Sequence, residues 1–208
     1  MKKLLLAGTV VLLCIAPGAA QMNTQRFKEL TIETMTPDQK RVAEGIVSGP
    51  RKGMRGPFNA LLRSPELAER AQMLGEYVRF KSSIPPRLNE LAILLTARRW
   101  TAQYEWYAHH QLAMKAGLDP QIAAAIAEGR RPAAMPADDT IVYDYCKEIL
   151  DTGEASDASF KAVVDKFGER GAIDLIGAMG YYSLVSMVLN VDRVPIPDGG
   201  KLPLGPLK

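Results

Sequence analysis

Apolar residues recur every three or four positions through most of this chain, and strict alternation of apolar and polar residues appears in no segment. Spacing of three and four places one side of a helix against a core, whereas alternation is typical of a β-strand. The predicted fold class is therefore all-α, a single-domain helical bundle. Helices are expected over about 36–47, 64–80, 87–99, 104–116, 119–129, 138–150, 156–167 and 169–189.

Capping residues set the expected helix boundaries. Thr36 and Gln39 form the capping-box pattern of a helix start, and Ser64 and Asp119 each precede a proline at the first helical position. Gly117 is a typical residue just beyond a helix end. The apolar positions then predict which residues are buried: Leu67, Ala71, Leu74 and Val78 in the second helix, and Leu88, Leu91, Ala92, Leu94 and Leu95 in the third.

The first twenty residues form a separate segment. Two lysines precede an apolar run over 4–16, and small residues ending at Ala20 follow it. This order is typical of a secretory signal peptide, and the run is too short to span a membrane. We expect a leader at 1–20, cleavage before Gln21, and a periplasmic or secreted protein. An uncleaved anchor and a lipoprotein modified at Cys14 are the alternatives.

Composition narrows the remaining possibilities. Removing 20 of the 208 residues leaves 188, enough for one domain, expected at 21–190 with an extended tail at 191–208. Loss of the two leader lysines lowers the net charge from +3 to about +1, which gives no electrostatic case for a nucleic-acid partner. No apolar stretch after the leader is expected to span a bilayer. The expected partner is a small-molecule substrate.

The rare side chains of the chain gather in one predicted helix. Both tryptophans and both histidines lie within 100–110. Glu105 and His109 stand four positions apart and therefore share one side of a helix. A carboxylate beside an imidazole fixes its tautomer and stabilises its charged form, so this pair is a candidate for acid–base catalysis. Tyr104 and Trp106 are expected to line a substrate-binding site. The alternative is a surface pair of little energetic weight.

Two residues of the preceding predicted helix extend this candidate site. Glu90 lies among leucines, so we expect it to be partly buried and to complete a proton relay; pairing with a nearby arginine is the alternative. Arg98 can hold a substrate carboxylate through paired hydrogen bonds. A favourable interaction with the dipole at the end of its helix would explain Arg98 equally well.

Other mechanisms lack the residues they require. The sequence contains no nucleophile elbow, phosphate-binding loop or dinucleotide fingerprint. No metal site is predicted, because adjacent His109 and His110 point in different directions on a helix. After loss of the leader Cys146 is the single cysteine, which excludes an internal disulfide and dithiol chemistry within one chain. Tyr181 and Tyr182 are expected to be core or interface residues.

Three stretches resemble the carboxymuconolactone decarboxylase family, which shares the all-helical fold of the alkylhydroperoxidase D proteins. They are Leu91–Arg98, Gln103–His109 and Ala116–Leu118, and the likeness runs from about 56 to 190. The peroxidase branch carries a C-x-x-C motif followed four residues later by histidine, and Ala102 and Glu105 stand at the two cysteine positions here. The resemblance therefore implies that thiol peroxidase activity is absent, because that chemistry needs a thiolate.

The decarboxylase branch implies a lyase or isomerase that acts on a small carboxylated lactone or aromatic-derived acid. In that reading His109 is the general acid/base, Glu105 orients it or serves as the partner base, Glu90 completes the relay, and no metal or organic cofactor takes part. A homo-oligomer, a trimer or a hexamer, is also implied. The alternative is a non-catalytic periplasmic helical oligomer that binds small aromatics or a protein. A cavity at Glu105 and His109 favours the enzyme.

Overall fold

The computed structural model describes residues 25–197 and 202–206, and every regular element within them is a helix. This confirms the all-α fold class. The elements are α1 (Pro37–Ser48), α2 (Phe58–Leu61), α3 (Pro65–Phe80), α4 (Pro86–Arg99), α5 (Gln103–Lys115), α6 (Pro120–Ala127), α7 (Ala137–Thr152) and α8 (Asp157–Asp192). The expected leader at 1–20 lies outside the described residues.

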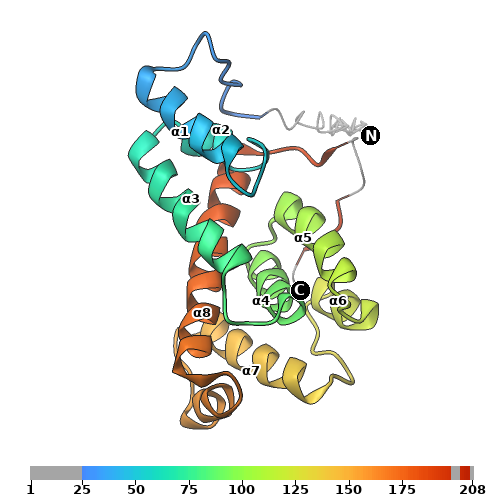
Figure 1. Cartoon of the computed structure of the whole chain (residues 1–208). Helices are drawn as coiled ribbons and strands as arrows, with labels where there is room; N and C mark the ends of the chain where they lie inside the picture. Colours follow the sequence, from blue (N-terminus) through green and yellow to red (C-terminus); the bar gives the residue numbers. More distant parts are fainter. Residues whose placement is uncertain (1–24, 198–201, 207–208) are drawn as a thin grey trace, which may run out of the picture.

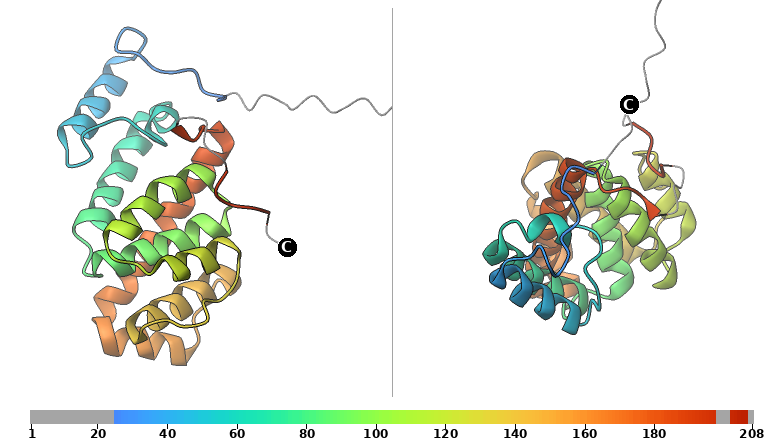
Figure 2. Two further views of the ribbon diagram at one scale, coloured as in Figure 1. Left: turned by 90° about the vertical axis from the view of Figure 1, so that its right-hand side faces the viewer. Right: turned by 90° about the horizontal axis from the view of Figure 1, so that it is seen from above.

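Helix α4 is the centre of the molecule. All eleven residues from Leu88 to Arg98 are buried, because α5, α6, α7 and α8 each pack against this helix. Figure 1 shows α8 running the length of the molecule, with α3 beside it and α5 and α6 on the other side of α4. Seen from the side in Figure 2, α7 and the start of α8 lie at the opposite end from α1.

The apolar interior has two parts. One surrounds α4 through α7, and the other is formed by α1, α2, α3 and the second half of α8. Helices α4 and α8 contribute to both, so the two parts form one continuous body rather than separate domains. The candidate chemistry lies where α5, from the first part, faces α8 and the segment before α2, from the second.

The helix boundaries agree with the capping pattern, with particular exceptions. Thr36 forms the expected capping box with Gln39, whereas Ser64 makes no side-chain capping bond. The two helices expected at 156–167 and 169–189 meet at a kink within α8, because Gly168, with φ 71° and ψ 171°, lies outside the helical region between them. The four-residue helix α2 has no sequence signal beyond the proline that precedes it.

The buried side of α3 differs from the prediction. Leu67 and Leu74 are 46% and 45% exposed, and the buried residues are Ala68, Ala71, Gly75 and Val78. Small residues face α8 because the helices approach closely there: a Cβ added at Gly75 would lie 2.3 Å from side-chain atoms of Arg51 and Tyr181. This close approach seats Arg51 and Tyr181 beside the candidate site.

A tight turn joins α4 to α5. Thr101 adopts φ 47°, in the left-handed region, and the amide of Ala102 donates to the carbonyl of Ala97 at 2.9 Å. The chain therefore reverses within three residues, and α5 packs back against α4. This reversal brings Glu90 of α4 beside the side of α5 that carries Glu105 and His109.

The described segments on either side of the helices are both held to the helical body by hydrogen bonds. Asp192, fully buried at the end of α8, accepts hydrogen bonds from the Phe27 amide at 2.7 Å and the Gln25 side chain at 2.8 Å. In the tail, the Gln103 side chain pairs with both backbone groups of Leu204, at 2.8 and 2.9 Å. Beyond Asp192 the described tail residues contain no α-helix, and α8 itself extends two residues into the range 191–208 expected for the tail.

Helix α8 differs from the expectation that no apolar stretch after the leader is long enough to span a bilayer. By length and composition alone it is long and apolar enough to cross a membrane, and it is the one such helix among the described residues. However, 56% of the qualifying window is buried inside the fold. Its apolar character is accounted for by its place in both parts of the interior.

Candidate active site

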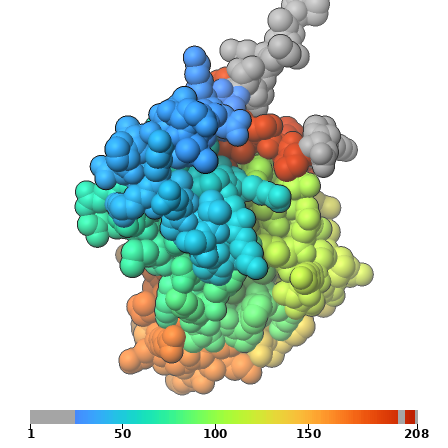
Figure 3. All heavy atoms as spheres, turned by 45° about the horizontal axis from the view of Figure 1, so that its top comes forward, coloured from blue at the N-terminus to red at the C-terminus, as the bar shows by residue number. Residues whose placement is uncertain are grey.

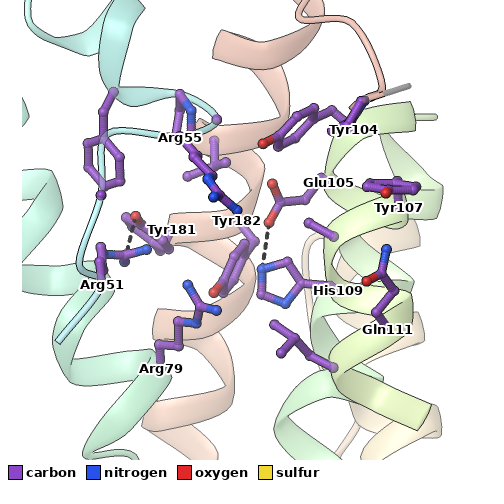
Figure 4. Close-up of a pocket in the computed structure, with 18 of the residues that line it drawn as sticks. Arg51, Arg55, Arg79, Tyr104, Glu105, Tyr107, His109, Gln111, Tyr181 and Tyr182 are labelled. Carbon is purple, nitrogen blue, oxygen red and sulfur yellow. Dashed lines mark hydrogen bonds and ion pairs between the residues drawn. The ribbon is translucent and has the colours of Figure 1, made fainter. Parts of the chain in front are cut away.

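A cavity of about 670 Å³ lies between α5 and the second half of α8. Helix α5 contributes Tyr104, Glu105, Tyr107 and His109 to one wall, which we call the α5 wall. The loop over residues 49–57, hereafter the basic loop, contributes to the opposite wall. Figure 3 shows this loop and α5 side by side at the surface of the molecule. Figure 4 shows the two walls facing each other, with Tyr182 between them. The cavity is large enough for a small-molecule substrate.

On the α5 wall, His109 lies between two buried carboxylates. Its Nε2 is 3.0 Å from Oε1 of Glu105, one helical turn earlier, as the spacing of four predicts. Its Nδ1 is 2.7 Å from Oε2 of Glu90, which reaches across from α4. All three residues are at most 8% exposed. Within the described residues, no three side chains of metal-binding type are arranged to hold an ion.

This arrangement fixes the protonation state of His109. Burial by itself lowers the pKa of the imidazole, but attraction to Glu105 and the hydrogen bonds to Glu105 and Glu90 outweigh it and raise the pKa from 6.5 to about 9. At neutral pH His109 is therefore an imidazolium whose two N–H groups both donate to carboxylates. Glu105 and His109 line the cavity, while Glu90 supports His109 from behind.

The wall opposite α5 is strongly basic. Arg51, Lys52 and Arg55 come from the basic loop and Arg79 from α3, and all four line the cavity. Among the described residues, none of them pairs with a carboxylate, although ten other arginines and lysines of the chain do. Glycines shape this wall: Gly56, at φ 73°, lets the loop approach Tyr104, and a Cβ there would lie 3.3 Å from the ring. Unpaired cations beside a cavity are suited to an anionic ligand.

Two tyrosines of α8, Tyr181 and Tyr182, belong to the buried core as expected, and both also line the cavity. Arg51 donates a hydrogen bond to the Tyr181 hydroxyl at 3.0 Å. The ring of Tyr182 meets the ring of His109 edge-on, with centroids 4.7 Å apart. Both tyrosines are 2% exposed.

Two residues that the sequence placed in the site lie elsewhere. Trp106 is in the core of the molecule and stacks on His110 at 6.1 Å, since one residue along a helix turns the side chain by about 100° away from Glu105. Arg98 is about 12 Å along α4 from Glu90. Its guanidinium donates to the carbonyl of Gly205 in the tail at 2.9 Å. Neither Trp106 nor Arg98 lines this cavity.

Cys146 does not line the cavity, and its thiol is not reactive. It is fully buried in the core around α4 through α7, and burial raises the pKa of its thiol far above the usual range. A thiol that stays protonated is a poor nucleophile. The cysteine positions of the resembling peroxidase branch are occupied by Ala102, which is buried at the start of α5, and Glu105.

The basic wall is the part of the site that the sequence analysis missed. A signal for it exists: the Gly- and Pro-rich segment over 49–57 holds three basic residues, and no acidic residue occurs between Glu44 and Glu66. A loop with unbalanced charge is a candidate anion-binding element. Arg79 carries no comparable signal, because its contribution depends on how α3 packs beside α8.

No protein-family model matches the chain, and no curated protein matches it. Among solved structures, one that is similar comes from Agrobacterium tumefaciens and is a protein of unknown function with a suggested role as the antioxidant defence protein AhpD. The two share 16% sequence identity at a TM-score of 0.56, over 69% of this chain and 99% of that chain. This chain therefore has an alkylhydroperoxidase D-like helical fold.

Proposed function

We propose that this protein is a cofactor-free acid–base enzyme that acts on a small carboxylated lactone or aromatic-derived acid, as carboxymuconolactone decarboxylase-like lyases and isomerases do. One observation carries the proposal: His109, held between Glu90 and Glu105, faces a cavity whose other wall bears four cations that pair with no carboxylate of the described residues. The first feature provides proton transfer, and the second suits a carboxylated substrate. Such a cavity favours an enzyme over the alternative of a purely binding or structural oligomer.

The roles within the site follow from the contacts. Glu105 lines the cavity and takes a proton from a substrate carbon next to a carbonyl, or returns one to it. The imidazolium of His109 stabilises the Glu105 carboxylate and exchanges protons with it, and Glu90 keeps His109 charged. Arg51, Arg55 and Arg79 take over the substrate-binding role that the sequence assigned to Arg98. Loss of carbon dioxide or isomerisation is the reaction class.

The suggested role of the similar structure is antioxidant defence, which would involve thiol peroxidase chemistry. The residues of this chain do not favour that chemistry. It requires a reactive thiolate beside the proton relay. Cys146 is buried in the other part of the interior, and Ala102 and Glu105 stand at the two relevant positions. We therefore expect peroxide turnover to be absent.

Export and assembly complete the proposal. The leader at 1–20 supports a periplasmic or secreted enzyme. Exposed apolar side chains on α3 and α8 support a homo-oligomer; they are Leu67, Leu74, Ile173, Ile176 and Met187. Intact-mass analysis of a periplasmic extract tests the first part, because the mature chain is expected to begin at Gln21. Light scattering of the purified protein tests the second.

Activity is tested by incubating the purified protein with carboxylated lactones and lignin-derived aromatic acids and identifying the products by mass spectrometry. We expect turnover of at least one such acid, loss of turnover in Glu105→Gln, and unchanged turnover in Cys146→Ala. The cysteine variant is the matched control because its side chain is buried away from the cavity. Peroxide turnover that Cys146→Ala abolishes would overturn the proposal.

A further inference from the structure

The hydroxyl of Tyr182 is buried beside His109 and has no hydrogen-bond partner among the described residues. Tyr182 lines the cavity, and Figure 4 places its side chain between Arg79 and His109. Its neighbour Tyr181 is equally buried but accepts a hydrogen bond from Arg51 at 3.0 Å. The two adjacent tyrosines are thus buried to the same extent, but only the Tyr181 hydroxyl has a hydrogen-bond partner among the described residues.

An unpartnered buried hydroxyl is unfavourable, because the group gives up its hydrogen bonds to water and gains none in return. The large majority of buried side-chain polar atoms in native proteins have a hydrogen-bond partner. Among the described residues the hydroxyls of Tyr182 and Ser186 both lack one, and Tyr182 is the one that lines the cavity, where a ligand can supply the partner. Burial also raises the pKa of the Tyr182 phenol well above its usual range. The group therefore remains a neutral hydrogen-bond donor throughout the physiological pH range.

We propose that the Tyr182 hydroxyl donates a hydrogen bond to the carbonyl oxygen of the substrate and stabilises the negative charge that develops there. The inference rests on the proposed function, since it assumes a proton transfer next to that carbonyl. In this step the carbon–hydrogen bond breaks, the proton passes to the Glu105 carboxylate, and the electron pair moves onto the carbonyl oxygen. Tyr182 keeps its own proton and remains neutral.

The position of Tyr182 suits this role. Its ring meets the ring of His109, which is paired with Glu105, and Figure 4 shows the side chain between His109 and Arg79 of the basic wall. A substrate whose carboxylate faces the arginines would therefore present its reacting end to Glu105 and Tyr182 together. A preorganised donor at the oxygen where charge develops is among the largest contributions to catalysis of this kind.

Two probe ligands isolate the hydroxyl's contribution. We would measure binding of 4-hydroxy-3-nitrobenzoate, at a pH where its phenol is ionised, and of 3-nitrobenzoate, which lacks the phenol oxygen. The phenolate oxygen takes the place of the charged substrate oxygen, and both ligands carry the carboxylate for the basic wall. Tyr182→Phe is expected to weaken binding of the hydroxylated probe about tenfold, and to leave binding of 3-nitrobenzoate unchanged.

Thermal stability of the ligand-free variants provides a second measurement. Tyr182→Phe is expected to melt no lower than the wild type, because it removes a hydroxyl without a partner. Tyr181→Phe, which costs Arg51 its partner, is expected to melt lower. If Tyr182→Phe melts at a lower temperature than the wild type, or weakens binding of both probes equally, the proposed role of Tyr182 is wrong, whereas the proposed function is unaffected. Failure of both probes to bind the wild type instead contradicts the anion-binding cavity, and the proposed function with it.

Discussion

The two walls of the cavity both carry charge, but they arrange it in opposite ways. On the α5 wall the charged groups satisfy one another: the imidazolium of His109 is bracketed by Glu90 and Glu105 within 3.0 Å, and all three are buried. On the opposite wall Arg55 and Arg79 have no carboxylate partner among the described residues. Paired charges hold a proton in a defined place, whereas unpaired charges are available to a ligand. The α5 wall therefore provides the proton chemistry of the site, and the opposite wall provides the charges that bind a ligand.

The largest expected effect follows from breaking the α5 wall. His109→Gln cannot carry a proton, so turnover on an established substrate should fall by about 10²–10⁴. Stability should also fall, by about 3–5 kcal/mol, because two buried carboxylates lose the cation between them. Turnover per folded molecule and denaturant unfolding measure the two effects separately. His110→Gln is the matched control, since His110 faces Trp106 and not the cavity. Equal turnover in both variants would retire the catalytic role of His109.

The pH dependence of stability tests the same wall without a substrate. The pKa of His109 is about 9 in the folded protein and about 6.5 in the unfolded chain, so the folded state binds its proton more tightly. The resulting stabilisation, about 3 kcal/mol, is fully present below pH 6.5 and is lost as the pH rises through 9. Chemical denaturation across this range measures it. The same decline in His109→Gln would show that another group is responsible.

Charge removal on the opposite wall should change binding rather than proton transfer. Arg55→Ala and Arg79→Ala are each expected to weaken binding of 3-nitrobenzoate about tenfold, because a charge-assisted hydrogen bond is lost. The melting temperature should change little. Arg41→Ala is the control, since Arg41 is exposed on α1 and already paired with Glu69. An effect of the control as large as that of Arg55→Ala would indicate a nonspecific response to net charge.

A smaller effect tests how the basic wall is held in place. A Cβ at Gly75 would lie 2.3 Å from Arg51 and Tyr181, so Gly75→Ala must displace that pair and should cost about 1–3 kcal/mol. Gly180→Ala meets no heavy atom within 4 Å and should instead stabilise α8 by about 0.5–1 kcal/mol. Opposite shifts in the midpoint of denaturant unfolding are the expected result. A stabilising Gly75→Ala would mean that the wall is not closely packed.

The amino-acid sequence by itself determined the helices and one contact of the site. Capping residues and apolar periodicity are local properties, so the boundaries of α1, α4 and α5 follow from the chain without knowledge of the fold. The contact between Glu105 and His109 was equally predictable, because one helical turn separates them. The sequence pattern and the resemblance also indicated Glu90 as a third member, but not which ring nitrogen it binds.

Only the tertiary structure decided which surface packs against each side of a helix, and the rest of the site depends on that. Helical periodicity states which residues share a side of a helix, but not what packs against that side. Trp106 and Arg98 are therefore directed into the core and toward the tail, and the arginines of the basic wall come from segments far from α5 in sequence. The sequence likewise gives no sign that the Tyr182 hydroxyl lacks a hydrogen-bond partner among the described residues, since a missing hydrogen bond is a property of the space around a residue.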